Sequence, residues 1–122
     1  MRIAIEALGI HYFGGGRTAT LSLFEPLFSL DAENEYLIFL SQPEPSLETQ
    51  SGNVHQYIVS IKNRFLLRLW AQLFIPWLTR THDLVHFAKN LGVFGVRPPY
   101  LVTIYDMTTL VHPELLPVFD VW

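Results

Sequence analysis

Cysteine is absent from the 122 residues of this sequence. The chain therefore has neither a disulfide framework nor a thiol nucleophile, and it fits the reducing cytoplasm, where we expect it to act. Charged residues are few, at 16%, and the net charge is −3. A nucleic-acid partner is not expected, because a phosphate footprint needs clustered lysine and arginine. No apolar run reaches the ~20 residues that a bilayer-spanning helix needs.

Familiar motifs of hydrolases, triphosphate binding and zinc are also missing. The sequence has no G-x-S-x-G nucleophile elbow, and no Lys-Ser or Lys-Thr pair follows its glycine run. The segment from His82 to His86 spaces two histidines as a zinc-binding helix does, but it reads as a strand, and no third ligand is evident. We therefore expect neither usual hydrolase chemistry nor a metal.

What the sequence does contain is an alternation of strands and helices in a chain that is 50% apolar. Short apolar runs typical of buried parallel strands precede segments with apolar residues at helical spacing. The predicted strands cover 2–8, 36–40, 55–60, 83–87 and 100–105, and the predicted helices cover 17–30 and 64–80. Pro26 and Pro76 are expected to bend these helices. The order predicts the α/β class: a Rossmann-like parallel sheet with helices on both faces.

A glycine run, Gly14, Gly15 and Gly16, follows the first strand and its loop, and Arg17 comes next. Glycines let the backbone approach a ligand closely, and the first turn of a helix presents free N–H groups at the positive end of its dipole. Together with the charge of Arg17, this stretch predicts a site for a phosphate or another anion. The alternative is a flexible glycine turn that binds nothing.

The letters GGGRTA at 14–19 also satisfy the loose dinucleotide pattern G-x-G-x-x-G/A. In that class the first glycine follows the strand almost directly, whereas a loop of five residues intervenes here. An acidic residue should follow the second strand to bind a ribose, and Ser41 and Gln42 stand there instead. A dinucleotide-dependent oxidoreductase domain and a non-catalytic α/β binding module remain the alternative functions.

Polar residues follow the later strands, at the edge where open parallel sheets bind ligands. Lys89 and Asn90 come after the fourth strand, and Tyr105 and Asp106 end the fifth. A phenol and a carboxylate at this edge are candidate reactive groups. The alternative is that Asp106 caps the next turn while Tyr105 packs. His86, within the fourth strand, is expected to be packed or to line the cleft.

The helix at 64–80 is strongly apolar, with a narrow polar stripe of Arg64, Arg68 and Gln72. We expect its apolar side chains to be buried against the sheet, with the stripe as the exposed edge. Together with Lys62 and Arg80, the helix would also suit an anionic membrane surface. A peripheral contact with the cytoplasmic face of a membrane therefore stays open.

Four stretches, in this order, are similar to motifs of one known family. The opening strand is followed by GGGRTATLSLF, which resembles GGxGRYxxxLL, and DAENEYLIFL resembles DPxNEYxLF. The third, LWAQLFIPWLTRTHDLVHF, is similar to a helix EQxxLPxxLxxxxxDLxH that leads into a strand. The fourth, PPYLVTIYDMTTLVHPE, is similar to PxVVTIHDLxPLxxPE. The chain thus resembles the N-terminal domain of glycosyltransferase family 4, the group 1 transferases of the GT-B fold.

The resemblance implies retaining transfer of a sugar from a nucleotide-sugar donor to a hydroxyl of a glycan or lipid-linked acceptor, with no metal and no further cofactor. Residues 1–122 would form the acceptor-side, N-terminal half of a GT-B fold. The apolar end at Trp122 reads as a truncation. The nucleotide-binding domain would then be missing or supplied by a partner chain, and we expect the 122 residues alone to be inactive.

The resemblance also implies roles for the residues singled out above. The donor phosphates would bind at Gly14, Gly15, Gly16 and Arg17, and the acceptor at His86, Lys89 and Asn90. The reacting groups would be Tyr105 and Asp106. The family usually has histidine where Tyr105 stands, and a phenol cannot act as an imidazole does near neutral pH. This departure bears on catalytic strength and on the donor type.

Overall fold

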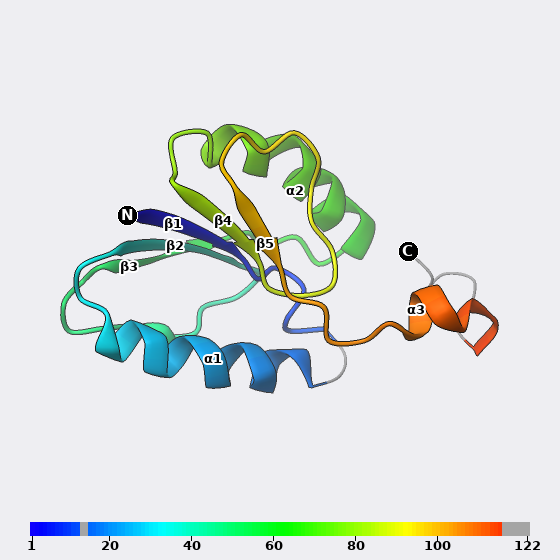
Figure 1. The fold of residues 1–122 in the computed structure, drawn as a ribbon, viewed down its shortest axis with the longest axis horizontal. Coiled ribbons are helices and arrows are strands. Elements are labelled where there is room, and N and C mark those ends of the chain that lie inside the picture. The colour runs from blue at the N-terminus through cyan, green and yellow to red at the C-terminus, as the bar shows by residue number, and fades with distance from the viewer. Residues whose placement is uncertain (13–14, 116–122) are drawn as a thin grey trace.

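The computed structural model describes residues 1–12 and 15–115, which form an open sheet of five parallel strands in the order β3-β2-β1-β4-β5. The strands are β1 (Arg2–Glu6), β2 (Glu35–Leu40), β3 (Val54–Ile58), β4 (Leu84–Phe87) and β5 (Tyr100–Val102). The helices are α1 (Gly16–Leu30), α2 (Arg64–Leu78) and the short α3 (Thr108–Val111), with 3-10 turns at Pro45–Leu47 and Pro113–Leu115. Figure 1 shows α1 and α2 on opposite faces of the sheet. The predicted Rossmann-like α/β class is confirmed.

The two faces of the sheet bury two separate apolar cores, because successive strand residues point to opposite sides. Toward α1, Ile5 and Ile38 meet Phe24 and Phe28, and the two phenyl rings stack with centroids 5.5 Å apart. Toward α2, a second cluster packs against the inner face of that helix: Ala4, Phe39, Val85, Phe87, Leu67, Ala71 and Ile75. Both cores hold the carboxyl ends of the central strands in fixed positions.

Element ends differ from the prediction where side chains redirect the backbone. β1 ends at Glu6 rather than at residue 8, because the Glu6 carboxylate accepts a hydrogen bond from the Leu8 amide at 2.9 Å. β5 ends at Val102 rather than at residue 105, and its continuation bonds to Asn90. α1 continues through Pro26 to its predicted end, and the segment predicted as a loop after Asp106 contains α3.

The outward side of α2 is exposed, which contradicts the prediction that the apolar side chains of this helix are buried. Its buried residues are Leu67, Ala71 and Ile75. Six large apolar side chains are exposed instead: Phe65, Leu66, Leu69, Leu73, Phe74 and Trp77. The helix is apolar on nearly all sides, and the sheet covers only one of them. The predicted polar stripe is not the free edge either, since Arg68 and Gln72 donate to the carbonyl oxygens of Gly92 and Phe94 in the loop before β5.

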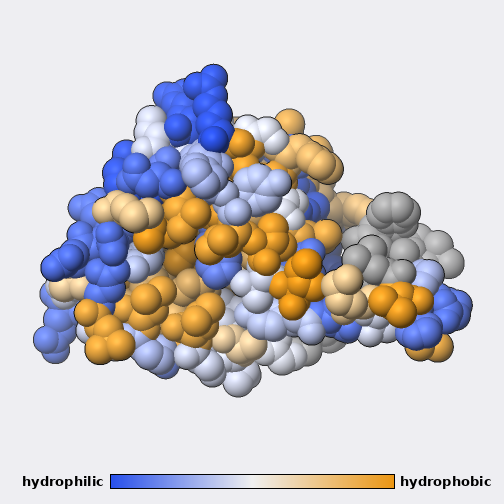
Figure 2. All heavy atoms as spheres, in the orientation of Figure 1, coloured by the Kyte–Doolittle hydropathy of each residue, from blue (hydrophilic) through white to orange (hydrophobic). Residues whose placement is uncertain are grey.

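β5 forms an apolar edge of the sheet, because no further strand pairs with its outer side within the described part of the chain. Tyr100, Leu101 and Val102 are all exposed. Figure 2 shows hydrophobic atoms gathered across the middle of the face that carries β5. Only three residues long, this strand limits the edge that it offers to another chain.

Candidate functional site

The strand order places a switch point between β1 and β4. From β1 the chain first runs outward through β2 and β3, and then returns to the other side of β1 for β4 and β5. Crossovers diverge at such a point and leave a crevice beyond the carboxyl ends of the strands, where ligands of open α/β sheets bind. α1 begins after β1, so its N-terminus lies at this edge, as the sequence predicts.

The first turn of α1 has no side-chain cap. Gly15 is the N-cap residue, with φ −73° and ψ 4°, and the first helical hydrogen bond runs from the Ala19 amide to the Gly15 carbonyl at 2.9 Å. The amides from Gly16 to Thr18 precede that bond, and such groups have no partner inside a helix. At α2, by contrast, the Asn63 side chain accepts from two first-turn amides. Gly14 lies outside the described residues.

Lys89 reaches the first turn of α1 from the far side of the switch point. A Cβ atom added to Gly16 would lie 3.0 Å from its Cε atom and 3.1 Å from its Nζ atom. The same ammonium donates to the Gly9 carbonyl at 3.4 Å. The resemblance implies an acceptor role for Lys89, and the structure brings its side chain against the glycine turn. A positive charge therefore lies beside the positive end of the helix dipole.

Arg17 is oriented by a buried carboxylate that the sequence analysis did not identify. Its Nε and one terminal nitrogen donate to the two oxygens of Glu44 at 2.8 and 3.0 Å. Glu44 is 3% exposed, whereas the side chain of Arg17 is 52% exposed. A guanidinium has five N–H donors, so the pair with Glu44 fixes Arg17 and leaves three donors for solvent or a ligand. Hydrogen bonding to Glu44 also raises the pKa of Arg17.

His11 completes this cluster on the buried side. Its Nδ1 atom lies 3.5 Å from a carboxylate oxygen of Glu44. Its Nε2 atom is buried and has no hydrogen-bond partner in the described part of the chain. Burial lowers the pKa of His11 more than the neighbouring carboxylate raises it. The imidazole is therefore mainly neutral at pH 7, and the positive charge of the cluster resides on Arg17.

Asn90 links the loop after β4 to the segment after β5. Its φ of 53° lies in the left-handed region, which asparagine tolerates better than most residues. Its Oδ1 atom accepts from the Tyr105 amide at 2.8 Å, and its own amide donates to the Thr103 carbonyl at 2.8 Å. Tyr105, which is 44% exposed, is thus fixed through its backbone amide to Asn90, the neighbour of Lys89 in sequence.

His86 and Asp106 each have partners that account for their positions. His86 Nε2 lies 2.7 Å from the Thr103 hydroxyl, its ring meets Phe24 edge-on, and burial lowers its pKa. Asp106 Oδ1 accepts from the amide and hydroxyl of Thr108 at 2.7 and 2.5 Å, and these bonds lower its pKa. Asp106 therefore bonds to the start of α3, as the alternative expects, whereas Tyr105 is 44% exposed and does not pack as that alternative requires. His86 is packed.

Glu6 is a second buried acid that the sequence analysis missed. It ends the central strand β1 and is 6% exposed. One oxygen accepts from Leu8, and the other lies 3.7 Å from a guanidinium nitrogen of Arg68 on α2. Burial raises the pKa of Glu6 more strongly than these two contacts lower it. The sequence contains a signal for the importance of Glu6, namely a carboxylate within an apolar strand, because such a residue requires a partner when it is buried.

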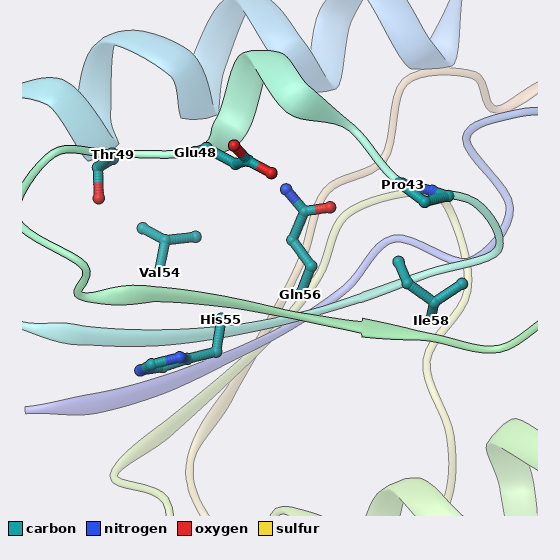
Figure 3. Close-up of a pocket in the computed structure, with 7 residues that line it drawn as sticks. All are labelled: Pro43, Glu48, Thr49, Val54, His55, Gln56 and Ile58. Atoms are coloured by element: carbon teal, nitrogen blue, oxygen red, sulfur yellow. The ribbon is translucent and has the colours of Figure 1, made fainter.

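An open hollow of about 510 Å³ lies against the edge strand β3. Figure 3 shows Val54, Gln56 and Ile58 pointing from β3 toward the segment with Pro43, Glu48 and Thr49. None of the residues that line it belongs to the glycine turn or to the Lys89–Asn90 segment. Gln56 already exchanges two hydrogen bonds with the backbone of Glu44, at 3.0 and 2.7 Å. The hollow is therefore separate from the site predicted from the sequence.

Within residues 1–12 and 15–115, no group of three or more histidine, cysteine, aspartate or glutamate residues could hold a metal ion. Comparison with protein-family models, curated proteins and solved structures gives no match. The central feature of the site is an uncapped helix N-terminus at the switch point of the sheet, with Lys89 against Gly16 and with Arg17 in the same turn.

Proposed function

We propose that the protein is the acceptor-side half of a retaining glycosyltransferase, which transfers a sugar from a nucleotide-sugar donor to an acceptor hydroxyl. The donor diphosphate binds at the first turn of α1. The observation that carries this proposal is that Lys89 lies against Gly16 in the uncapped first turn of α1, which also contains Arg17, at the switch point of the sheet. Backbone N–H groups and two cations are the chemistry that a diphosphate requires.

The sugar and the acceptor would lie beside this anion site, toward Asn90 and Tyr105. Lys89 touches Gly16, and Asn90, its neighbour in sequence, bonds to the Tyr105 amide. These contacts link the phosphate end of the site to the backbone of Tyr105. In this proposal Tyr105 donates a hydrogen bond near the transferred sugar, and Asp106 fixes the turn that follows it. The resemblance to the family supports a role for position 105 near the transferred sugar, and the role of Asp106 rests on its hydrogen bonds to Thr108.

In this proposal the carboxyl edge of the sheet forms one wall of the donor site. Ligand sites bury most of their ligand, so activity requires a second wall. We propose that a second nucleotide-binding domain, in the same protein or a partner chain, supplies the other wall. The described domain alone would bind nucleotide-sugars weakly and would not transfer the sugar.

A dinucleotide-binding domain is the second candidate, because the strand order matches the first five strands of the dinucleotide-binding fold. Against it, Ser41 and Gln42 follow β2 where an acidic residue should bind the ribose. The nearest following acid, Glu44, is buried and already engaged by Arg17. The glycosyltransferase proposal needs no acid at this position.

Ligand-observed saturation-transfer NMR can separate the two candidates. The probes are the glucose conjugates of uridine, guanosine and adenosine diphosphate, the free nucleoside diphosphates, and NAD. We expect at least one nucleotide-sugar to bind with contacts to its sugar protons, and inorganic pyrophosphate to compete with it. NAD binding that is tighter than every nucleotide-sugar would replace the proposal with the dinucleotide candidate. No binding of any probe would favour a non-catalytic module.

A further inference from the structure

The outward side of α2 is an apolar surface without a partner in the described chain. We call its six exposed side chains the outer face: Phe65, Leu66, Leu69, Leu73, Phe74 and Trp77. These residues are 44–76% exposed. At 100° per residue they cover about half of the helix circumference, opposite the three buried positions. Contiguous exposed patches of this kind mark interaction sites rather than ordinary surface.

A second segment extends this surface toward the candidate site. Phe94, in the loop before β5, is 87% exposed. Its backbone is fixed to α2 by two hydrogen bonds with the Gln72 side chain, at 3.0 and 3.1 Å. The same loop begins with Lys89 and Asn90. The apolar surface therefore borders the carboxyl edge of the sheet.

The charged residues within 62–80 are all positive: Lys62, Arg64, Arg68 and Arg80. Arg64 and Arg68 are engaged on the sheet side of α2, by the Tyr12 ring and the Gly92 carbonyl, which leaves Lys62 and Arg80 at the two ends of the helix. The Arg80 guanidinium stacks on the Trp77 ring at 5.0 Å, so the charge lies beside the apolar surface. Aromatic and leucine side chains flanked by arginine and lysine are typical of helices that lie in the interface of an anionic membrane.

We propose that the outer face of α2 binds the surface of a membrane containing anionic lipids, with the helix parallel to the bilayer. The helix does not cross it, since no helix in the described ranges is long and apolar enough to span a membrane. This inference stands independently of the proposed function. If both hold, the membrane would present a lipid-linked acceptor next to the Lys89 loop.

The test is flotation of the protein with two kinds of vesicle, one of phosphatidylcholine alone and one with 3:7 phosphatidylglycerol to phosphatidylcholine. We expect partition onto the anionic vesicles only, and weaker partition at high salt. Leu69→Glu combined with Leu73→Glu should reduce that partition about tenfold or more, because the change removes apolar contact and adds negative charge. Lys62→Gln should reduce it about fivefold, the effect of one cation near an anionic surface.

Leu30→Glu is the matched control, because Leu30 is an 86% exposed leucine on α1, at the opposite face of the sheet. It should leave partition within about twofold, since α1 does not touch the membrane in this arrangement. Far-ultraviolet circular dichroism reports whether each variant is folded. Absence of binding to the anionic vesicles would overturn the proposal. So would a dimer in sedimentation velocity that the α2 variant, but not Leu30→Glu, dissociates, because the outer face would then bind a second copy.

The flotation test contains no nucleotide. Its failure therefore leaves the proposed function untouched, and failure of the nucleotide-sugar probes leaves membrane binding untouched.

Discussion

Substitution of Gly16 by alanine separates the stability of the fold from anion binding. The new Cβ would lie 3.0–3.1 Å from the Cε, Cδ and Nζ atoms of Lys89, which is closer than ordinary contact. The three nearest atoms all belong to this flexible side chain, so we expect the lysine to move rather than the helix. Alanine also suits a helix better than glycine, by up to about 1 kcal/mol. We therefore expect the free energy of unfolding in urea to stay within about 1 kcal/mol of wild type, without loss of fold.

Anion binding should respond in the opposite way. A hydrogen bond to a charged group contributes about 1.5–3 kcal/mol, so displacement of the ammonium from the site should weaken pyrophosphate binding roughly tenfold or more. The dissociation constant is measured by titrating the 15N-labelled protein with pyrophosphate and following the first-turn amides of α1. NMR is suitable because the open site is expected to bind weakly.

Gly9→Ala is the matched control, because a Cβ at Gly9 would meet no atom within 4 Å. It should leave the pyrophosphate dissociation constant within about twofold. Two results would refute the reasoning about Lys89 and the glycine turn. One is an unchanged dissociation constant in Gly16→Ala, and the other is an equal loss in both variants.

Three further predictions follow from the side-chain contacts. Arg17→Gln leaves the Glu44 carboxylate buried without its charged partner and should lower the free energy of unfolding. The double variant with Glu44→Gln should regain part of this loss, and equal losses in the single and double variants would contradict the coupling. The folded-state pKa of His86 is below its usual 6.5, so as the pH falls below about 6.5 the unfolded state takes up the proton first and stability decreases. His86→Gln should flatten the dependence of urea unfolding on pH between 7 and 5, and an unchanged slope would contradict this. Asn90→Ala places alanine at φ 53° and removes the hydrogen bond to the Tyr105 amide, which should lower the free energy of unfolding by about 2 kcal/mol. Asn90→Gly should lower it less, because glycine tolerates this φ. Equal melting temperatures for the two variants would contradict the argument from the backbone.

The sequence predicts well where local pattern decides the structure. The apolar runs around Ile5, Ile38 and Val85 become the three central strands, because only strands buried on both faces carry such runs. The glycine run and the amphipathic segment after it likewise predict α1 to within one residue. The carboxyl edge was identified from the same order of elements.

Contacts between distant segments were not predictable in this way. Glu44 lies 27 residues from Arg17 in a stretch that reads as a polar surface loop, and no periodicity links the two. The position of Lys89 after the fourth strand predicts that it lies at the carboxyl edge, but not that its long side chain reaches Gly16 across the switch point. Such pairs are set by the three-dimensional arrangement of the crossovers.

The error over α2 has a different cause. Hydrophobicity alone does not distinguish a helix buried on all sides from one that exposes an apolar face to a partner. The sequence feature that indicates an exposed apolar face is the absence of any acid between residues 62 and 80. That signal concerns charge rather than apolar periodicity.

The most direct test of the central claim is a chemical-shift map of the 15N-labelled protein titrated with a nucleotide-sugar. We predict that the amides of Gly15, Gly16 and Arg17 shift together with those of Lys89, Asn90 and Tyr105, and that the residues lining the hollow beside β3 do not. Shifts confined to that hollow, or no shift at the first turn of α1, would contradict the proposed donor site.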